Sequence, residues 1–120
     1  MKYQTRRVVM YSHLNSAGQL FGGQALAWID EESAIFAASE VGHARIVTKK
    51  MSEVEFKSPA NLGDILIIGT QLASVGRTSL TVKCAIRNQT TGKVIVTVDE
   101  MVFVALDDNN KPTAHHLPPV

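Results

Sequence analysis

Several residue types that define large protein classes are scarce in this chain of 120 residues. A single cysteine, Cys84, excludes a disulfide within the chain and fits a reducing compartment. A net charge of +1 gives no overall field favouring nucleic acid or an anionic membrane. No apolar run approaches the ~20 residues of a membrane span, and Val8–Met10 is too short for a signal peptide. We expect a single cytoplasmic domain over residues 1–120, with no nucleic-acid or membrane partner.

Motifs for metals and nucleotides are also missing. Histidine, cysteine and aspartate do not recur at the spacing of a zinc site, and no glycine pattern of a P-loop or dinucleotide fold is present. Cys84 alternates with Val82 and Ile86, which predicts a packed rather than a reactive thiol. The single tryptophan, Trp28, is expected in a core or an interface. We therefore expect neither a metal nor an organic cofactor.

What is present predicts the order β-α-β-β-β-β. Residues 3–11 have the character of a strand, and residues 12–22 that of a polar loop. From Gly23 to about Val41 there are many alanines and no breakers, which predicts a helix of about five turns that ends at Gly42. Extended segments are expected at 45–56, 65–75, 77–88 and 94–106, and a loose tail from about residue 113.

The predicted helix is apolar on nearly every side, so it must be buried. Because the later strands are joined mostly by hairpins, we expect an α+β fold in which an antiparallel sheet of about five strands curls around one central helix. One sheet cannot cover the whole helix surface. A second subunit is expected to cover part of it.

The start of this helix carries the features that point to chemistry. Gly22 and Gly23 leave backbone N–H groups bare, where they can stabilise a developing negative charge. Asp30 lies two turns further along among alanines, where a carboxylate is costly unless it is paired or used. Such donors and such an acid suit hydrolysis of an activated acyl group. The simpler interpretations are a tight turn and a solvent-facing aspartate, although Glu31 and Glu32 already occupy the more polar sides.

The order of elements resembles the hotdog fold. More narrowly, Asn15-x-x-Gly18-x-x-Phe21-Gly22-Gly23 followed by Asp30 resembles the hotdog acyl-CoA thioesterases, both the small bacterial hydrolases and the two-domain mammalian ones. The similarity spans roughly residues 7–112, and one departure is His13, where relatives often carry an acid. Further matches are Arg45-x-Val47-Thr48, Phe56-x-x-Pro59-x-x-x-Gly63-Asp64, Gly76-Arg77-Thr78-Ser79 and Phe103-Val104-Ala105-Leu106-Asp107.

This resemblance implies hydrolysis of acyl-CoA to free acid and coenzyme A, as in fatty acid metabolism. Asp30 would act as general base on water or as nucleophile, and we favour the general base. The Gly23 N–H would donate to the oxyanion, while the Asn15 amide would bind the thioester carbonyl or orient the water. Asn15 and Asp30 would come from opposite subunits of a dimer, and the family often forms tetramers or hexamers.

Other residues would hold the coenzyme A part of the substrate. Thr48 would line the pantetheine channel, or it is only a strand residue. Basic and hydroxyl side chains suit phosphates, although a solvated hairpin explains them equally well. The candidates are Gly22, Thr48, Arg77, Thr78 and Ser79, with Lys49, Lys50 and Lys57 as further cations.

Two other functions remain open from the sequence. A hotdog hydratase or dehydratase would need a histidine base, for which His13 and His43 are the candidates, although a lone loop histidine is more often incidental. His115 and His116 are expected to belong to the tail. The third possibility is a non-catalytic acyl-CoA-binding module.

Overall fold

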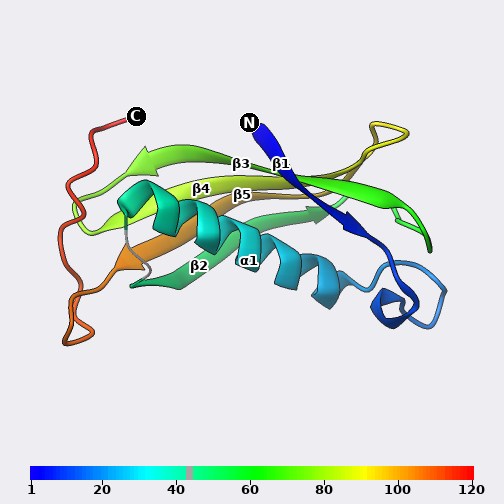
Figure 1. The fold of residues 1–120 in the computed structure, drawn as a ribbon, viewed down its shortest axis with the longest axis horizontal. Helices are drawn as coiled ribbons and strands as arrows, with labels where there is room; N and C mark the ends of the chain where they lie inside the picture. The colour runs from blue at the N-terminus through cyan, green and yellow to red at the C-terminus, as the bar shows by residue number, and fades with distance from the viewer. Residues whose placement is uncertain (43–44) are drawn as a thin grey trace.

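One antiparallel sheet and one long helix make up the structure, a computed structural model that describes residues 1–42 and 45–120 (Figure 1). The strand order is β1-β3-β4-β5-β2, and all neighbouring strands are antiparallel. This confirms the expected sheet of five strands around one helix. The elements are β1 (Lys2–Val8), the 3-10 helix η1 (Tyr11–His13), α1 (Gly22–Val41), β2 (Ile46–Phe56), β3 (Ile65–Val75), β4 (Ser79–Asn88) and β5 (Val94–Ala105).

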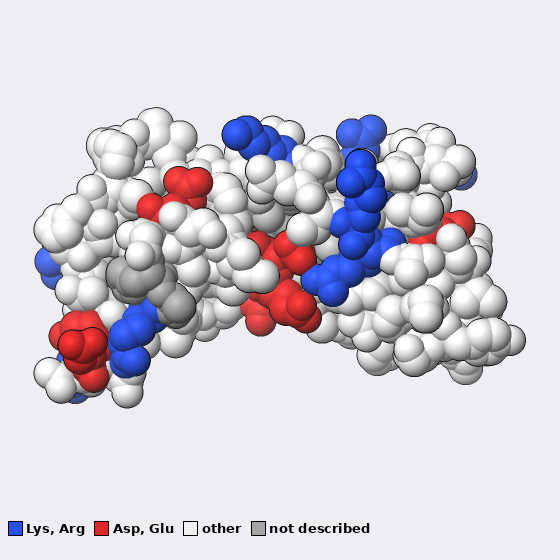
Figure 2. Space-filling model, viewed as in Figure 1, with Lys and Arg blue, Asp and Glu red and all other residues white. Residues whose placement is uncertain are grey.

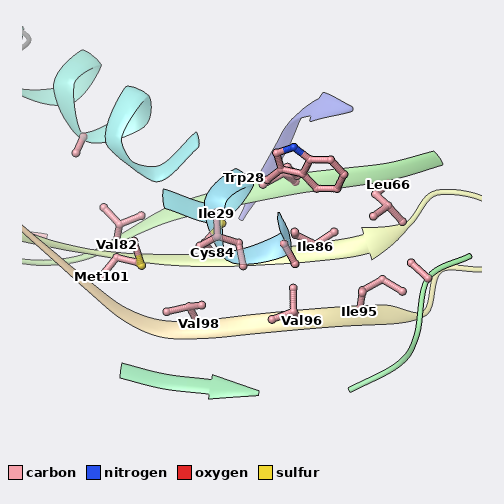
Figure 3. Packing of buried hydrophobic residues seen from close by; sticks show 14 of the residues in the cluster. Trp28, Ile29, Leu66, Val82, Cys84, Ile86, Ile95, Val96, Val98 and Met101 are labelled. Carbon is pink, nitrogen blue, oxygen red and sulfur yellow. The ribbon is translucent and has the colours of Figure 1, made fainter. Parts of the chain in front are cut away.

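The core lies between α1 and the sheet, as Figure 3 shows. The buried residues of α1 lie on one face of the helix, at spacings of three or four positions except for one adjacent pair: Ala25, Trp28, Ile29, Ser33 and Ala37. In β4 every second residue from Leu80 is buried, as the period of two requires, including Val82, Cys84 and Ile86, and Ala85 is buried as well. Trp28 and Cys84 are both core residues, as predicted.

The sheet leaves part of α1 uncovered. Ile35 on α1 is 59% exposed, and Phe36 is only half-buried. Such apolar surface agrees with the expectation that the sheet of one chain cannot bury the whole helix. In the part of the chain that the structure describes, no helix is long and apolar enough to cross a membrane.

Two segments differ from the sequence prediction. β1 ends at Val8 rather than near residue 11, because the chain then turns through η1, where the His13 N–H donates to the Met10 carbonyl at 3.0 Å. The expectation of a loose tail is wrong for residues 113–117. Thr113 N–H donates to the Ala105 carbonyl at 2.9 Å, and the buried His115 makes further hydrogen bonds described below.

Candidate active site

A depression of 390 Å³ lies at the start of α1, between the loop that precedes the helix and the end of β2. In Figure 1 this is the end of the molecule where the chain enters α1. The segment after β2 reaches this loop, since the Leu20 N–H donates to the Ala60 carbonyl at 2.8 Å. The residues that line the depression are Asn15, Gln19, Leu20, Gly22, Phe56, Lys57, Ser58 and Pro59.

The first two amides of α1 are free to bind a ligand. The N–H groups of Gln24 and Ala25 both donate to the Phe21 carbonyl, at 3.1 Å each. Within residues 1–42 and 45–120, the amides of Gly22 and Gly23 have no acceptor. No side chain caps this helix end either. The helix start therefore offers N–H groups and the positive end of its dipole to an anion.

Aromatic rings crowd these two glycines. A Cβ at Gly22 would lie 3.3 Å from the ring of Phe56, and one at Gly23 would lie 2.5 Å from the ring of Phe21. Phe21 and Phe56 are themselves 55% and 58% exposed. Glycine thus lets two exposed aromatic rings approach the backbone more closely than a side chain at either position would allow.

Asn15 borders the depression and organises the loop. Its side-chain oxygen accepts hydrogen bonds from the amides of Ala17 at 2.9 Å and Gln19 at 3.1 Å. This is the turn-forming role that asparagine commonly takes. Its carboxamide NH₂ has no acceptor within the described residues, so it remains a donor for a substrate oxygen or a water molecule.

Asp30 and Thr48 form a second group, away from the depression. Asp30 is half-buried on α1, and its Oδ1 accepts a hydrogen bond of 2.8 Å from the Thr48 hydroxyl on β2. Asp30 lies seven positions after Gly23, which is roughly 10 Å along a helix axis. The oxyanion donors and the acid of one chain therefore cannot meet on one carbonyl carbon.

The two glutamates beside Asp30 form ion pairs with an arginine of β1. Arg7 on β1 lies 2.7 Å from Glu32 and 3.3 Å from Glu31, and Figure 2 shows acidic side chains beside a basic band there. The hydrogen bond to Glu32 is the main reason why the pKa of Arg7 is raised above its ordinary value. No cation pairs with Asp30 among the described residues, so its carboxylate is left to accept hydrogen bonds.

His13 supports the loop rather than the depression. Its Nδ1 accepts the Met10 N–H at 2.9 Å, and its ring packs edge-on against Trp28 with centroids 4.9 Å apart. These contacts give His13 a structural role that requires no part in catalysis. His43, the other candidate base, lies outside the described residues.

The remaining coenzyme A candidates do not lie together. Lys57 lines the depression and is 3.7 Å from Glu55, whereas Lys50 is 3.6 Å from Glu100. The segment Arg77-Thr78-Ser79 forms the β3–β4 turn at the opposite end of the sheet (Figure 1). No three His, Cys, Asp or Glu side chains in the described ranges are placed to hold a metal ion.

Sequence reasoning missed three features. It assigned Thr48 to the substrate channel but did not pair it with Asp30, because that contact joins α1 to β2 across the fold. It did not place Phe21 against Gly23, or Phe56 against Gly22. β2 shows no regular alternation of buried and exposed residues, so the available signal for Phe56 was its place at the strand end, just before Pro59.

Comparison with known proteins agrees with this architecture. The family model of the thioesterase superfamily matches residues 17–95, and the chain therefore belongs to that superfamily. A protein of Haemophilus influenzae, named as an uncharacterized acyl-CoA thioester hydrolase, is 30% identical over 88% of this chain and 72% of its own length. A hexameric hotdog fold thioesterase of Campylobacter jejuni superposes with a TM-score of 0.82 at 29% identity, over 95% of this chain and 90% of that one.

A third relative has been solved with ligands. The acyl-CoA hydrolase of Staphylococcus aureus, in complex with butyryl coenzyme A, coenzyme A and coenzyme A disulfide, superposes with a TM-score of 0.85. It is 34% identical, and the match covers 97% of this chain and 68% of that one. These likenesses confirm the hotdog fold and the thioesterase family that the sequence motifs indicated.

Proposed function

We propose that this protein hydrolyses acyl-CoA thioesters to free acid and coenzyme A. The observation that carries the proposal is the pair of free amides at Gly22 and Gly23, together with the Thr48-held carboxylate of Asp30. Free amides at a helix start are oxyanion donors, and a positioned carboxylate is a general base. Relatives named as acyl-CoA hydrolases support the substrate class.

Asp30 takes a proton from water while the water oxygen attacks the thioester carbonyl carbon. The carbonyl oxygen becomes an oxyanion, which the Gly23 N–H and the Asn15 NH₂ stabilise. Collapse of the tetrahedral intermediate breaks the C–S bond, and the thiolate of coenzyme A leaves and takes up a proton. Thr48 fixes the carboxylate so that one Asp30 oxygen faces the water. No metal or organic cofactor is needed for these steps.

The separation of Asp30 from the helix start has a consequence for assembly. The acid lies roughly 10 Å from Gly23 in one chain, whereas a reacting atom must lie about 3 Å from both groups. We infer that Asp30 of one subunit works with Gly23 and Asn15 of another. At least a dimer is then required, and hexameric relatives favour three such dimers. The location that we propose is the cytoplasm.

The experiment is replacement of Asp30 by asparagine, assayed as coenzyme A release from a panel of acyl-CoAs. Removing the general base should lower kcat by about two orders of magnitude or more while KM changes little. The matched control is Asp108→Asn, because Asp108 is exposed in a loop after β5. Near-normal turnover by Asp30→Asn would show that this carboxylate is not the base.

A further inference from the structure

Residues 113–117, here called the C-terminal strap, lie against the turn between β3 and β4. Figure 1 shows this last segment running along the end of the sheet where β5 ends and β4 begins. The strap is attached at its start by the hydrogen bond from Thr113 N–H to the Ala105 carbonyl, and Leu117 packs against the hydrophobic core. The strap is therefore a docked part of the domain.

His115 is the centre of this attachment. It is only 9% exposed, and its Nε2 lies 2.7 Å from the Ser79 carbonyl, while the Leu117 N–H donates to its Nδ1 at 3.0 Å. A carbonyl can only accept and an amide N–H can only donate, so the ring carries its proton on Nε2. The His115 amide also donates to the Arg77 carbonyl at 3.3 Å. One residue thus binds the turn twice.

The strap completes the bonding of the turn's backbone. The carbonyls of Arg77, Thr78 and Ser79 all accept hydrogen bonds. The Arg77 carbonyl accepts from the His115 N–H, the Thr78 carbonyl from the Ala105 N–H at 2.9 Å, and the Ser79 carbonyl from the Gly76 N–H at 2.9 Å. Two of these three carbonyls receive a bond from His115. If the strap detached, the turn would keep only the hydrogen bond from the Ala105 N–H of β5 and the one from its own Gly76 N–H.

Arg77 is the residue that this turn presents. It is exposed, and no carboxylate pairs with its guanidinium in the part of the chain that the structure describes. Ser79 of β4 and Val47 of β2 both pair with Val104 of β5, the strand between them. Since neighbouring strands are about 5 Å apart, the turn and the start of β2 lie about 10 Å apart. Thr48, which holds Asp30, is the next residue of β2.

From this geometry we infer that the C-terminal strap positions Arg77 for the phosphates of the coenzyme A part of the substrate, with His115 as the positioning residue. The inference rests on the proposed thioesterase function. A long pantetheine arm separates the thioester from the phosphates, so an anion site some distance from Asp30 is what such a substrate needs. Holding the turn in place beforehand lowers the entropy cost of binding its charged group.

The test compares two substrates with the same acyl group, an acyl-CoA and the matching S-acyl pantetheine, which lacks the phosphates. His115→Asn keeps an acceptor near the Leu117 N–H but loses the bond to Ser79 O. It should raise KM for acyl-CoA by about three- to tenfold, leave kcat unchanged, and leave KM for the pantetheine thioester unchanged. His115→Gln, whose amide can still donate to Ser79 O, should recover most of the lost affinity.

The control is the adjacent residue. His116 is exposed and has φ +62°, a conformation that asparagine tolerates, so His116→Asn makes the same substitution without touching the turn and should match the wild type. Arg77→Ala should reproduce the selective rise in KM, and the double variant with His115→Asn should add nothing further. Leu117→Ala provides a second way to loosen the strap if His115→Asn folds poorly.

Three results would overturn the inference. They are an unchanged KM for acyl-CoA in the strap variants, an equal rise in KM for both substrates, and additive effects of Arg77→Ala and His115→Asn. If the wild type hydrolyses acyl-CoA and the strap variants behave as it does, only the strap inference fails. A wild type with no activity on any acyl-CoA would instead remove the proposed function and the inference with it.

Discussion

Asp30 is one of three consecutive acidic residues in the middle of α1, and the three have different partners. Glu31 and Glu32 both lie within 3.3 Å of Arg7, so their charges are partly neutralised. Asp30 accepts a hydrogen bond from a neutral hydroxyl and has no cation partner within the described residues. Within the described residues the Asp30 carboxylate is thus held by a hydrogen bond and not by an ion pair, and it keeps the capacity to accept a further hydrogen bond from a water molecule.

Cys84 allows a prediction on pH. Burial raises the pKa of its thiol from 9.0 to about 11, although the Ser33 hydroxyl acts in the opposite direction. Because the folded-state pKa is the higher one, this contribution to stability is complete below pH 9 and is lost as the pH rises toward about 11. The full loss is about 2–3 kcal/mol.

Urea unfolding at a series of pH values between 8 and about 11 checks this, with Cys84→Ala as the reference. The variant is less stable at pH 8 because of its cavity, but it lacks the titrating thiol. The gap in unfolding free energy between the two proteins should narrow as the pH rises. A gap that stays constant would contradict the expected thiol titration.

At the scale of the elements, the C-terminus of α1 depends on one glycine. Gly42 caps the helix at φ +91°, and its N–H donates to the Ala38 carbonyl. A Cβ there would meet no atom within 4 Å, so alanine brings only backbone strain. Gly42→Ala should therefore lower the unfolding free energy by about 1 kcal/mol, and Gly42→Asn by less, since asparagine tolerates this conformation.

Thermal or urea unfolding of the wild type and the two variants measures these differences. Equal stability of Gly42→Ala and the wild type would show that the end of α1 rearranges to a different cap. The depression and Asp30 are remote from Gly42 along the helix, so kcat should be unchanged in both variants.

The elements were predictable to the extent that their signals are local. The alternation of Leu80, Val82, Cys84 and Ile86 and the breaker-free run before Gly42 predicted β4 and α1 within two residues of their observed ends. The 3-10 turn and the strap were not predictable, because His115 is held by backbone atoms far away in the chain. The Asp30–Thr48 hydrogen bond was not predicted, for the same reason. The glycines at the start of α1 were identified as a helix start from their local motif.

At the scale of the whole molecule, the division of the site between subunits can be tested by mixing variants. Asn15→Ala and Asp30→Asn should each have little activity as separate proteins. After subunit exchange, half of the dimers are hybrids, and in each hybrid one of the two sites has both intact residues. The mixture should therefore recover roughly a quarter of the wild-type activity.

A mixture of Asp30→Asn with Asp30→Ala is the control, because no combination of those subunits contains an intact acid. It should stay inactive under the same exchange conditions. Failure of the first mixture to recover activity, with exchange verified by mass, would place the whole site within one chain and contradict the inferred assembly.

Trp28 gives the molecule an internal optical signal. It is the only tryptophan in the chain, and it is bordered by the ring of His13 and by the Arg7 guanidinium 5.8 Å from its centroid. His13 belongs to the same loop as Asn15, so a shift of that loop changes the surroundings of a single fluorophore. Intrinsic emission can therefore report, in a stopped-flow instrument and without a label, when ligand enters the depression at the start of α1.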